Sequence, residues 1–297
     1  MRDPEFEASL HDAALYPSLW RLVLGAALAL FLWLATSLVI VGAATAVVAA
    51  REGALGIMPF VTGLASPDTP GKVILLLSTF VGLFVGSIVA AAALHFRGPA
   101  SLFGPAGAWW RGFAVSLTVI LPIYGVLSGA SILFGGVEGN LAFGRWLILL
   151  PLALPFLFVQ IAAEELFFRG YLQQQLAVRF RARAVWMWLP SVIFALLHVS
   201  PEAGDNLPLV LLATLTFALV AADLTERTGA LGAAMGLHLG NNFFGLFIVS
   251  TGETITGLSL FRAPVEIGQA GPQSLSMAGA VLVMLVVWGI TVRLLDR

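Results

Sequence analysis

Two adjacent glutamates, Glu164 and Glu165, follow a long uncharged segment in the run PFLFVQIAAEELFFRG. An ionisable side chain within hydrocarbon costs about 2.5 kcal/mol or more, so such residues indicate a function. Arg169 is four residues after Glu165, in the favourable order of acid before base, and we expect it to neutralise that carboxylate. Glu164 is rotated by about 100° from Glu165 and lacks such a partner, so it is the stronger candidate for a general base. The alternative is that the helix ends here and both acids lie at the membrane interface.

Two histidines occur in helical patterns further along the chain. Phe194 and His198 are four residues apart in a short apolar segment, and His238 and Asn242 have the same spacing. Each pair therefore shares one helix face. A single histidine near a helix end is usually structural. Small residues also recur every four positions around the second pair, at Gly232, Gly236 and Gly240. That spacing allows close packing of membrane helices, which accounts for the glycines but not for His238.

The composition predicts that membrane lipid surrounds these residues. Hydrophobic residues make up 59% of the 297 residues, charged residues 10%, and the mean hydropathy is +0.97. These values are incompatible with a soluble globular protein. The net charge of -1 and the lack of a basic stripe give no indication of nucleic-acid binding. The chain has no cysteine, which excludes a thiol nucleophile and disulfides.

The uncharged segments predict an all-α polytopic bundle of about eight transmembrane helices. Each is near the ~20 residues that a helix needs to cross about 30 Å of hydrocarbon. The fifth and sixth are the weakest, because the fifth is short and the sixth begins with Asn206 and Pro208. The segments are 22–50, 73–94, 112–137, 146–163, 184–197, 206–222, 228–251 and 267–292.

The helix lengths predict that the polar residues meet at one level of the membrane. The fourth and fifth predicted helices form an antiparallel hairpin that turns near residues 181 and 182, with Glu164 and His198 at similar distances on either side of the turn. At 1.5 Å per residue, both lie roughly 25 Å along their helices. His238 and Asn242 lie about 16 to 22 Å along the seventh helix from the same side. Three helices can thus bring a carboxylate, two imidazoles and an amide together.

The distribution of positive charge predicts the orientation. With eight helices and the N-terminus inside, eleven of the fifteen Lys and Arg residues lie on the cytoplasmic side, against Arg51, Lys72, Arg145 and Arg262 outside. We therefore expect both termini to be cytoplasmic. We expect residues 1–18 to form a cytoplasmic tail, in which MRDPEF (1–6) resembles residues encoded by cloning sites. Residues 19–297 then form a single transmembrane domain, with the motifs within 146–251.

Together these motifs resemble those of the CPBP family of intramembrane proteases, also called the Abi family, which includes the CAAX prenyl proteases and the Ras-converting endopeptidases. The three family motifs, EExxxR, FxxxH and HxxxN, occur in order as EELFFR (164–169), FALLH (194–198) and HLGNN (238–242). Each motif is weak alone, but the ordered set is specific. The resemblance covers roughly residues 70 to 250.

The resemblance implies a role for each motif residue. Glu164 and His198 would activate water, and His238 and Asn242 would stabilise the oxyanion. Glu165 and Arg169 would support Glu164, and Phe194 would pack around the imidazole. A metal is a further implication, because two histidines and a glutamate form a known ligand set for catalytic zinc, here Glu164, His198 and His238. The chain has no HExxH helix, and a mechanism without Zn²⁺ or another divalent metal uses the same residues.

We therefore expect a hydrolase that cleaves a membrane-embedded or lipid-linked (CAAX-type) peptide, with lipid and this substrate as its partners. Two other classes fit the same residues: a non-catalytic membrane partner of the bacteriocin-immunity or scaffold type, and a transporter coupled to protons or cations. The ratio of 14 arginines to one lysine suggests a GC-rich bacterial genome, in which prenylation is not expected. The expected location is the bacterial inner membrane.

Overall fold

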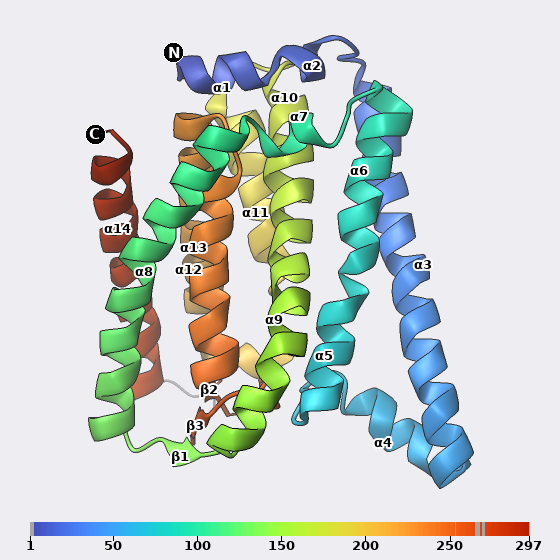
Figure 1. Cartoon of the computed structure of the whole chain (residues 1–297), viewed down its shortest axis with the longest axis vertical. Helices are drawn as coiled ribbons and strands as arrows, with labels where there is room; N and C mark the ends of the chain where they lie inside the picture. The colour runs from blue at the N-terminus through green and yellow to red at the C-terminus, as the bar shows by residue number, and fades with distance from the viewer. Residues whose placement is uncertain (1–2, 253, 265–267, 269–270, 297) are drawn as a thin grey trace.

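The computed structural model describes residues 3–252, 254–264, 268 and 271–296, and it is an all-α bundle of long helices (Figure 1). Both ends of the chain lie at the same end of the bundle. Arg2 and Arg297, which the predicted orientation used, lie outside the described residues. The longest helices are α3 (Leu19–Glu52), α8 (Ala106–Phe134), α9 (Phe143–Glu165), α12 (Leu207–Thr228) and α14 (Pro272–Leu295).

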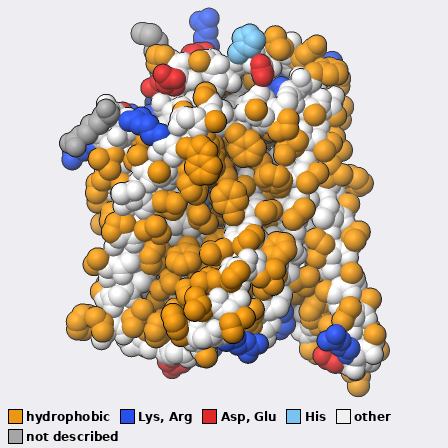
Figure 2. Space-filling view, in the orientation of Figure 1, with side chains coloured by type: hydrophobic (Ala, Val, Ile, Leu, Met, Phe, Trp, Pro, Cys, Tyr) orange, Lys and Arg blue, Asp and Glu red, His pale blue; other side chains and the backbone are white. Residues whose placement is uncertain are grey.

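Six helical segments within the described residues are long and apolar enough to cross a membrane. One of them joins α5 (Pro70–Thr79) to α6 (Val81–His95), and another joins α9 to the π-helix η2 (Leu166–Gln173) and α10 (Gln174–Ala177). The bundle is therefore an all-α polytopic membrane fold. Figure 2 shows apolar side chains over the middle of one face, with charged side chains mainly at its two ends.

The other two predicted spans are short helices. The fifth consists of the π-helix η3 (Ala184–Trp188) and α11 (Leu189–Leu196), and the seventh of α13 (Gly232–Phe243) and the π-helix η5 (Phe244–Ile248). α13 has 12 residues and η5 has five, fewer together than the ~20 that cross hydrocarbon. The count of eight spans stays a prediction.

The glycines of α13 pack against α8, as their spacing predicts. A Cβ atom on Gly236 would lie 2.6 Å from the backbone oxygen of Phe113, and one on Gly232 would collide with the backbone of Trp109. Gly86 of α6 makes a similar approach to the backbone of Ala29 in α3. Both helix pairs thus depend on backbone contact that a larger side chain would block.

Short elements lie at both ends of the bundle. Near the termini are α1 (Pro4–Ser9), α2 (His11–Ala14) and α7 (Ala100–Phe103). At the other end are η1 (Ala54–Gly56), α4 (Ile57–Thr62), η4 (Pro201–Asn206) and three short strands, β1 (Glu138–Gly139), β2 (Val249–Thr251) and β3 (Phe261–Ala263). The strand order is β1-β3-β2, with β2 parallel and β1 antiparallel to β3.

The segment predicted as a tail packs on the bundle. Phe6 is fully buried, and its ring centroid lies 5.4 Å from that of Trp186 in η3. Gly229, after α12, approaches the backbone of Glu5. Residues 3–14 are therefore part of the folded structure.

Candidate active site

The glutamate pair lies at the last two positions of α9, where the helix changes to the wider π-helix η2. Turns of π-helix are rare and often occur at functional sites. Glu165 and Arg169 still meet across this change, with Nη1 donating to Oε1 at 3.1 Å, as the spacing predicts. The Glu165 side chain is completely buried and that of Arg169 is 2% exposed, so this ion pair lies inside the protein.

The buried carboxylate of Glu165 also binds His238. His238 Nδ1 lies 2.7 Å from Glu165 Oε1, and the imidazole is 4% exposed. Because an ionised carboxylate can only accept, Nδ1 carries a proton and donates it. Arg169 donates through Nη2 to the carbonyl of Ala218 in α12 at 3.1 Å. Glu165 thus orients an imidazole from another helix while Arg169 balances its charge.

The second nitrogen of His238 faces Glu164. Nε2 lies 3.5 Å from Oε2 of Glu164, whose side chain is 14% exposed and has no ion partner on its own helix among the described contacts. If His238 is neutral and Glu164 is ionised, both of these atoms are acceptors. The pair is attractive when a proton or a water molecule lies between them. This geometry places the Glu164 carboxylate beside an oriented imidazole.

One ring nitrogen of His198 is bound to the backbone, and the other points away from it. Nδ1 lies 2.8 Å from the carbonyl oxygen of Phe194, to which it donates, so the lone pair is on Nε2. The ring centroids of His198 and Phe194 are 4.8 Å apart. The guanidinium carbon of Arg169 lies 4.9 Å from the centroid of Phe194. Phe194 therefore separates the exposed His198 from the buried ion pair, which agrees with the packing role predicted for it.

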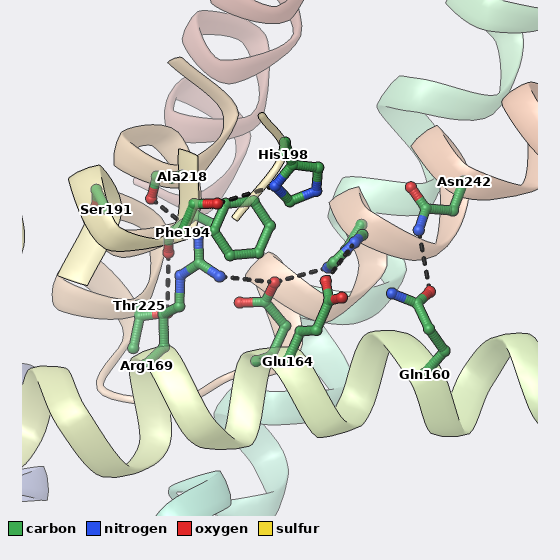
Figure 3. Close-up of polar contacts among 12 residues, drawn as sticks. Gln160, Glu164, Arg169, Ser191, Phe194, His198, Ala218, Thr225 and Asn242 are labelled. Carbon is green, nitrogen blue, oxygen red and sulfur yellow. Dashed lines mark hydrogen bonds and ion pairs between the residues drawn. The ribbon is translucent and has the colours of Figure 1, made fainter. Parts of the chain in front are cut away.

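A chain of amides continues from Glu164 along α9. Gln160 is four residues before Glu164, and its Oε1 accepts from Asn242 Nδ2 at 3.0 Å (Figure 3). Asn241 donates to Asn242 Oδ1 and accepts from the Tyr124 hydroxyl, both at 3.1 Å. Gln160, Asn241 and Tyr124 are not among the site residues that the sequence motifs predict. The spacing of Gln160 from Glu164 was a usable signal, whereas Tyr124 of α8 belongs to no motif.

These side chains line one cavity of about 260 Å³. Its polar walls come from α8, α9, α12, α13 and the turn after α11, and Figure 3 shows Glu164, His198 and Asn242 around one space. A second cavity of about 200 Å³ has apolar walls, including Trp33 and Leu83, and shares Glu164 and His198 with the first. The structure thus brings together the four predicted catalytic residues. The polar lining of the first cavity is Tyr124, Gln160, Glu164, His198, Thr214, His238, Asn241 and Asn242.

The donor atoms of this site do not form a complete metal site. Among the described residues there is no group of three His, Cys, Asp or Glu residues that could hold a metal ion. Glu164 and His238 are close enough to act as two ligands, but His198 does not complete the predicted set in this geometry.

The region that holds the three motifs also matches a known protein family. Residues 145–244 match the family model described as type II CAAX prenyl endopeptidase Rce1-like. The chain carries an Rce1-like domain. This agrees with the resemblance to the CPBP family, and the matched range contains all three motifs. The Rce1-like domain supplies Gln160, Glu164, His198, His238 and Asn242, whereas Tyr124 and α14 lie outside it.

One similar protein is the uncharacterized protein YyaK of Bacillus subtilis (strain 168), which is 30% identical over 114 residues. That alignment covers 38% of this chain and 38% of the relative. No solved structure matches the chain.

Proposed function

We propose that this protein is an intramembrane endopeptidase that hydrolyses a peptide bond of a membrane-embedded or lipid-linked substrate, with Glu164 as the general base. The Rce1-like domain supports intramembrane endopeptidase activity in general. The observation that carries the proposal is the convergence of Glu164, two imidazoles and an amide pair on one cavity.

The proposed reaction starts with water between Glu164 and His198. Glu164 accepts a proton from the water, and His198 Nε2 holds the water through a second hydrogen bond. The water oxygen forms a bond to the peptide carbonyl carbon. The carbonyl electron pair moves to its oxygen, producing a tetrahedral oxyanion. A positioned base of this kind typically contributes about 10² to 10⁴ in rate.

Hydrogen-bond donors then stabilise the negative charge of the oxyanion. His238 supplies Nε2–H in its doubly protonated form, with the ring held through Nδ1 by the Glu165 carboxylate at 2.7 Å. Asn242 Nδ2 has two protons, of which one is bound by Gln160 and the other is available. Collapse of the oxyanion breaks the carbon–nitrogen bond. Glu164 returns its proton to the leaving amine, so the products are a carboxylic acid and an amine and the base is regenerated.

The deciding experiment uses the purified protein and a library of quenched membrane peptides. We expect the wild type to cleave some members of the library. We expect Glu164→Gln to cleave the same peptides about 10²- to 10⁴-fold more slowly. Glu52→Gln is the matched control, since Glu52 is an exposed acid at the end of α3. Equal cleavage by Glu164→Gln and wild type would refute the assignment. Ion flux in liposomes without cleavage would instead favour a transporter, and a cellular phenotype that survives Glu164→Ala would favour a non-catalytic partner.

A further inference from the structure

A third cavity adjoins the candidate active site on the side away from the chain termini. Its volume is about 750 Å³, and its walls come from α8, α13, η5 and α14. In Figure 1 the lower parts of α8 and α14 lead towards the end of the bundle that carries the three strands. The walls combine apolar groups, such as Leu127 and Val283, with the hydroxyls of Ser128, Ser131 and Ser276.

This cavity adjoins the one that holds Glu164. Tyr124, Asn241 and Ala280 line both. The hydrogen bond from the Tyr124 hydroxyl to Asn241 Oδ1, at 3.1 Å, lies at the boundary. Asn241 also donates to Asn242, next to the proposed oxyanion position. A ligand that occupies both cavities therefore passes the Tyr124 and Asn241 side chains before it reaches Glu164.

Strand β2 presents an edge at the same place. The order β1-β3-β2 makes β2 an outer strand, and among the described residues no strand pairs with its other side. Val249, its first residue, lines the 750 Å³ cavity. The Ser250 hydroxyl lies 2.7 Å from that of Ser259, so the next side chain points to the opposite, buried face. An unpaired strand edge readily accepts another extended chain.

We propose that the 750 Å³ cavity binds the substrate as an extended polypeptide, which pairs with the edge of β2 and enters from the end of the bundle opposite the termini. This inference rests on the proposed endopeptidase function and adds how its substrate is held. A polypeptide fits both features of the site, because its amides can pair with β2 while its side chains contact the apolar walls. A lipid chain has no groups to pair with a strand edge.

An extended substrate has a testable periodicity. Successive side chains of a strand point to opposite faces, so every second substrate residue faces the same wall. Recognition through backbone pairing gives affinity without demanding one sequence, and alternate side chains supply the selection. We therefore expect contact with Val249 to recur at every second substrate position rather than at one position or at all of them.

Disulfide cross-linking tests this directly, because the chain has no cysteine of its own. Val249→Cys is combined with Glu164→Gln so that bound peptide is not consumed. The probes are apolar membrane peptides, each with one cysteine placed at successive positions. The matched control is Leu38→Cys on the outer face of α3, where the side chain is exposed and lines none of the three cavities described here. We expect cross-links at alternate peptide positions for Val249→Cys and weak, position-independent ones for Leu38→Cys.

Equal cross-linking at both sites, or no periodicity at Val249→Cys, would overturn the proposal. Capture of a thiol-bearing phospholipid in preference to every peptide would do the same. Thr251→Cys serves as a second probe of the strand if Val249→Cys fails to fold. Periodic cross-linking with no cleavage by the wild type would support polypeptide docking on β2 and contradict the proposed endopeptidase function. Cleavage that is lost in Glu164→Gln, with no periodic cross-linking, would support the endopeptidase function and contradict docking on β2.

Discussion

Glu165 Oε1 lies 2.7 Å from Nδ1 of His238, so the second glutamate of the motif holds an imidazole that comes from a different helix. The same oxygen accepts from Arg169, and both partners of the carboxylate are buried. The other carboxylate oxygen, Oε2, has no hydrogen-bond partner among the residues that the structure describes. Glu165 therefore fixes the orientation of His238, and the support of Glu164 expected from the sequence stays a prediction.

The buried ion pair of Glu165 and Arg169 predicts that substitutions of the two residues have non-additive effects on stability. Removing one partner of a buried ion pair typically costs about 3 to 5 kcal/mol, because the other charge is left unpaired. We expect Arg169→Gln and Glu165→Gln each to lower the unfolding midpoint in detergent, and the double variant to lose clearly less than the two effects added. Thermal unfolding of all four proteins measures the coupling. Simple additivity would mean that the pair does not act as a unit.

The amide pair predicts a graded loss of catalysis. Asn242→Ala removes a proposed oxyanion donor, and we expect kcat to fall about 10² to 10³-fold with little change in KM. Gln160→Met leaves the Asn242 amide in place but removes the acceptor that orients it, so its kcat should fall less. Steady-state kinetics on a cleaved library peptide separates these effects. A rise in KM alone for Asn242→Ala would assign the amide to substrate binding.

Metal dependence can be tested on the same reaction. The described residues contain no three-residue metal site, so we expect cleavage to survive treatment with a chelator and to gain nothing from added Zn²⁺. Elemental analysis of the purified protein provides a readout that does not depend on activity. Stoichiometric zinc, lost together in Glu164→Gln and His238→Ala, would show instead that the side chains rearrange to bind an ion.

Packing between α13 and α8 gives a test of the scaffold. Gly236→Leu would force a side chain into the backbone of Phe113, and overpacking of this kind typically costs about 1 to 3 kcal/mol. Gly129→Leu on α8 is the matched control, since a Cβ atom there meets nothing within 4 Å. We expect the unfolding midpoint to fall for Gly236→Leu only. Similar midpoints for the two variants would show that the helices separate more easily than the structure implies.

The predicted membrane orientation is open to a labelling test. His11 and Glu138 are exposed and lie at opposite ends of the bundle. In intact bacterial cells expressing the protein, a membrane-impermeant maleimide should label Glu138→Cys and spare His11→Cys until the cells are broken. The opposite pattern would place both termini outside, against the distribution of arginine.

Local spacing predicted more of the site than of the scaffold. The contact between Glu165 and Arg169 follows from a separation of four residues, and the approach of Glu164 to His238 agrees with the depth of their helices. The contact between Glu165 and His238 depends on how two helices are rotated about their axes, which no local pattern specifies. Tyr124 reaches Asn241 for the same non-local reason.

The departures in the fold also have physical causes. Hydropathy detects apolar segments but not where a helix stops, so it could not reveal that residues 228–251 form a short helix followed by strand β2. The three strands have two or three residues each, too few for an alternating pattern to be recognised. The segment 252–273 contains β3, and its positions 253, 265–267 and 269–270 lie outside the described residues.

The burial of Phe6 against Trp186 has a consequence for biosynthesis. The first helix of the chain contacts η3 and the region after α12, which leave the ribosome much later. That contact can form only when most of the protein has been translated and inserted. Until then the N-terminal segment is free to be bound by targeting and insertion factors, and its docking follows the synthesis of α12.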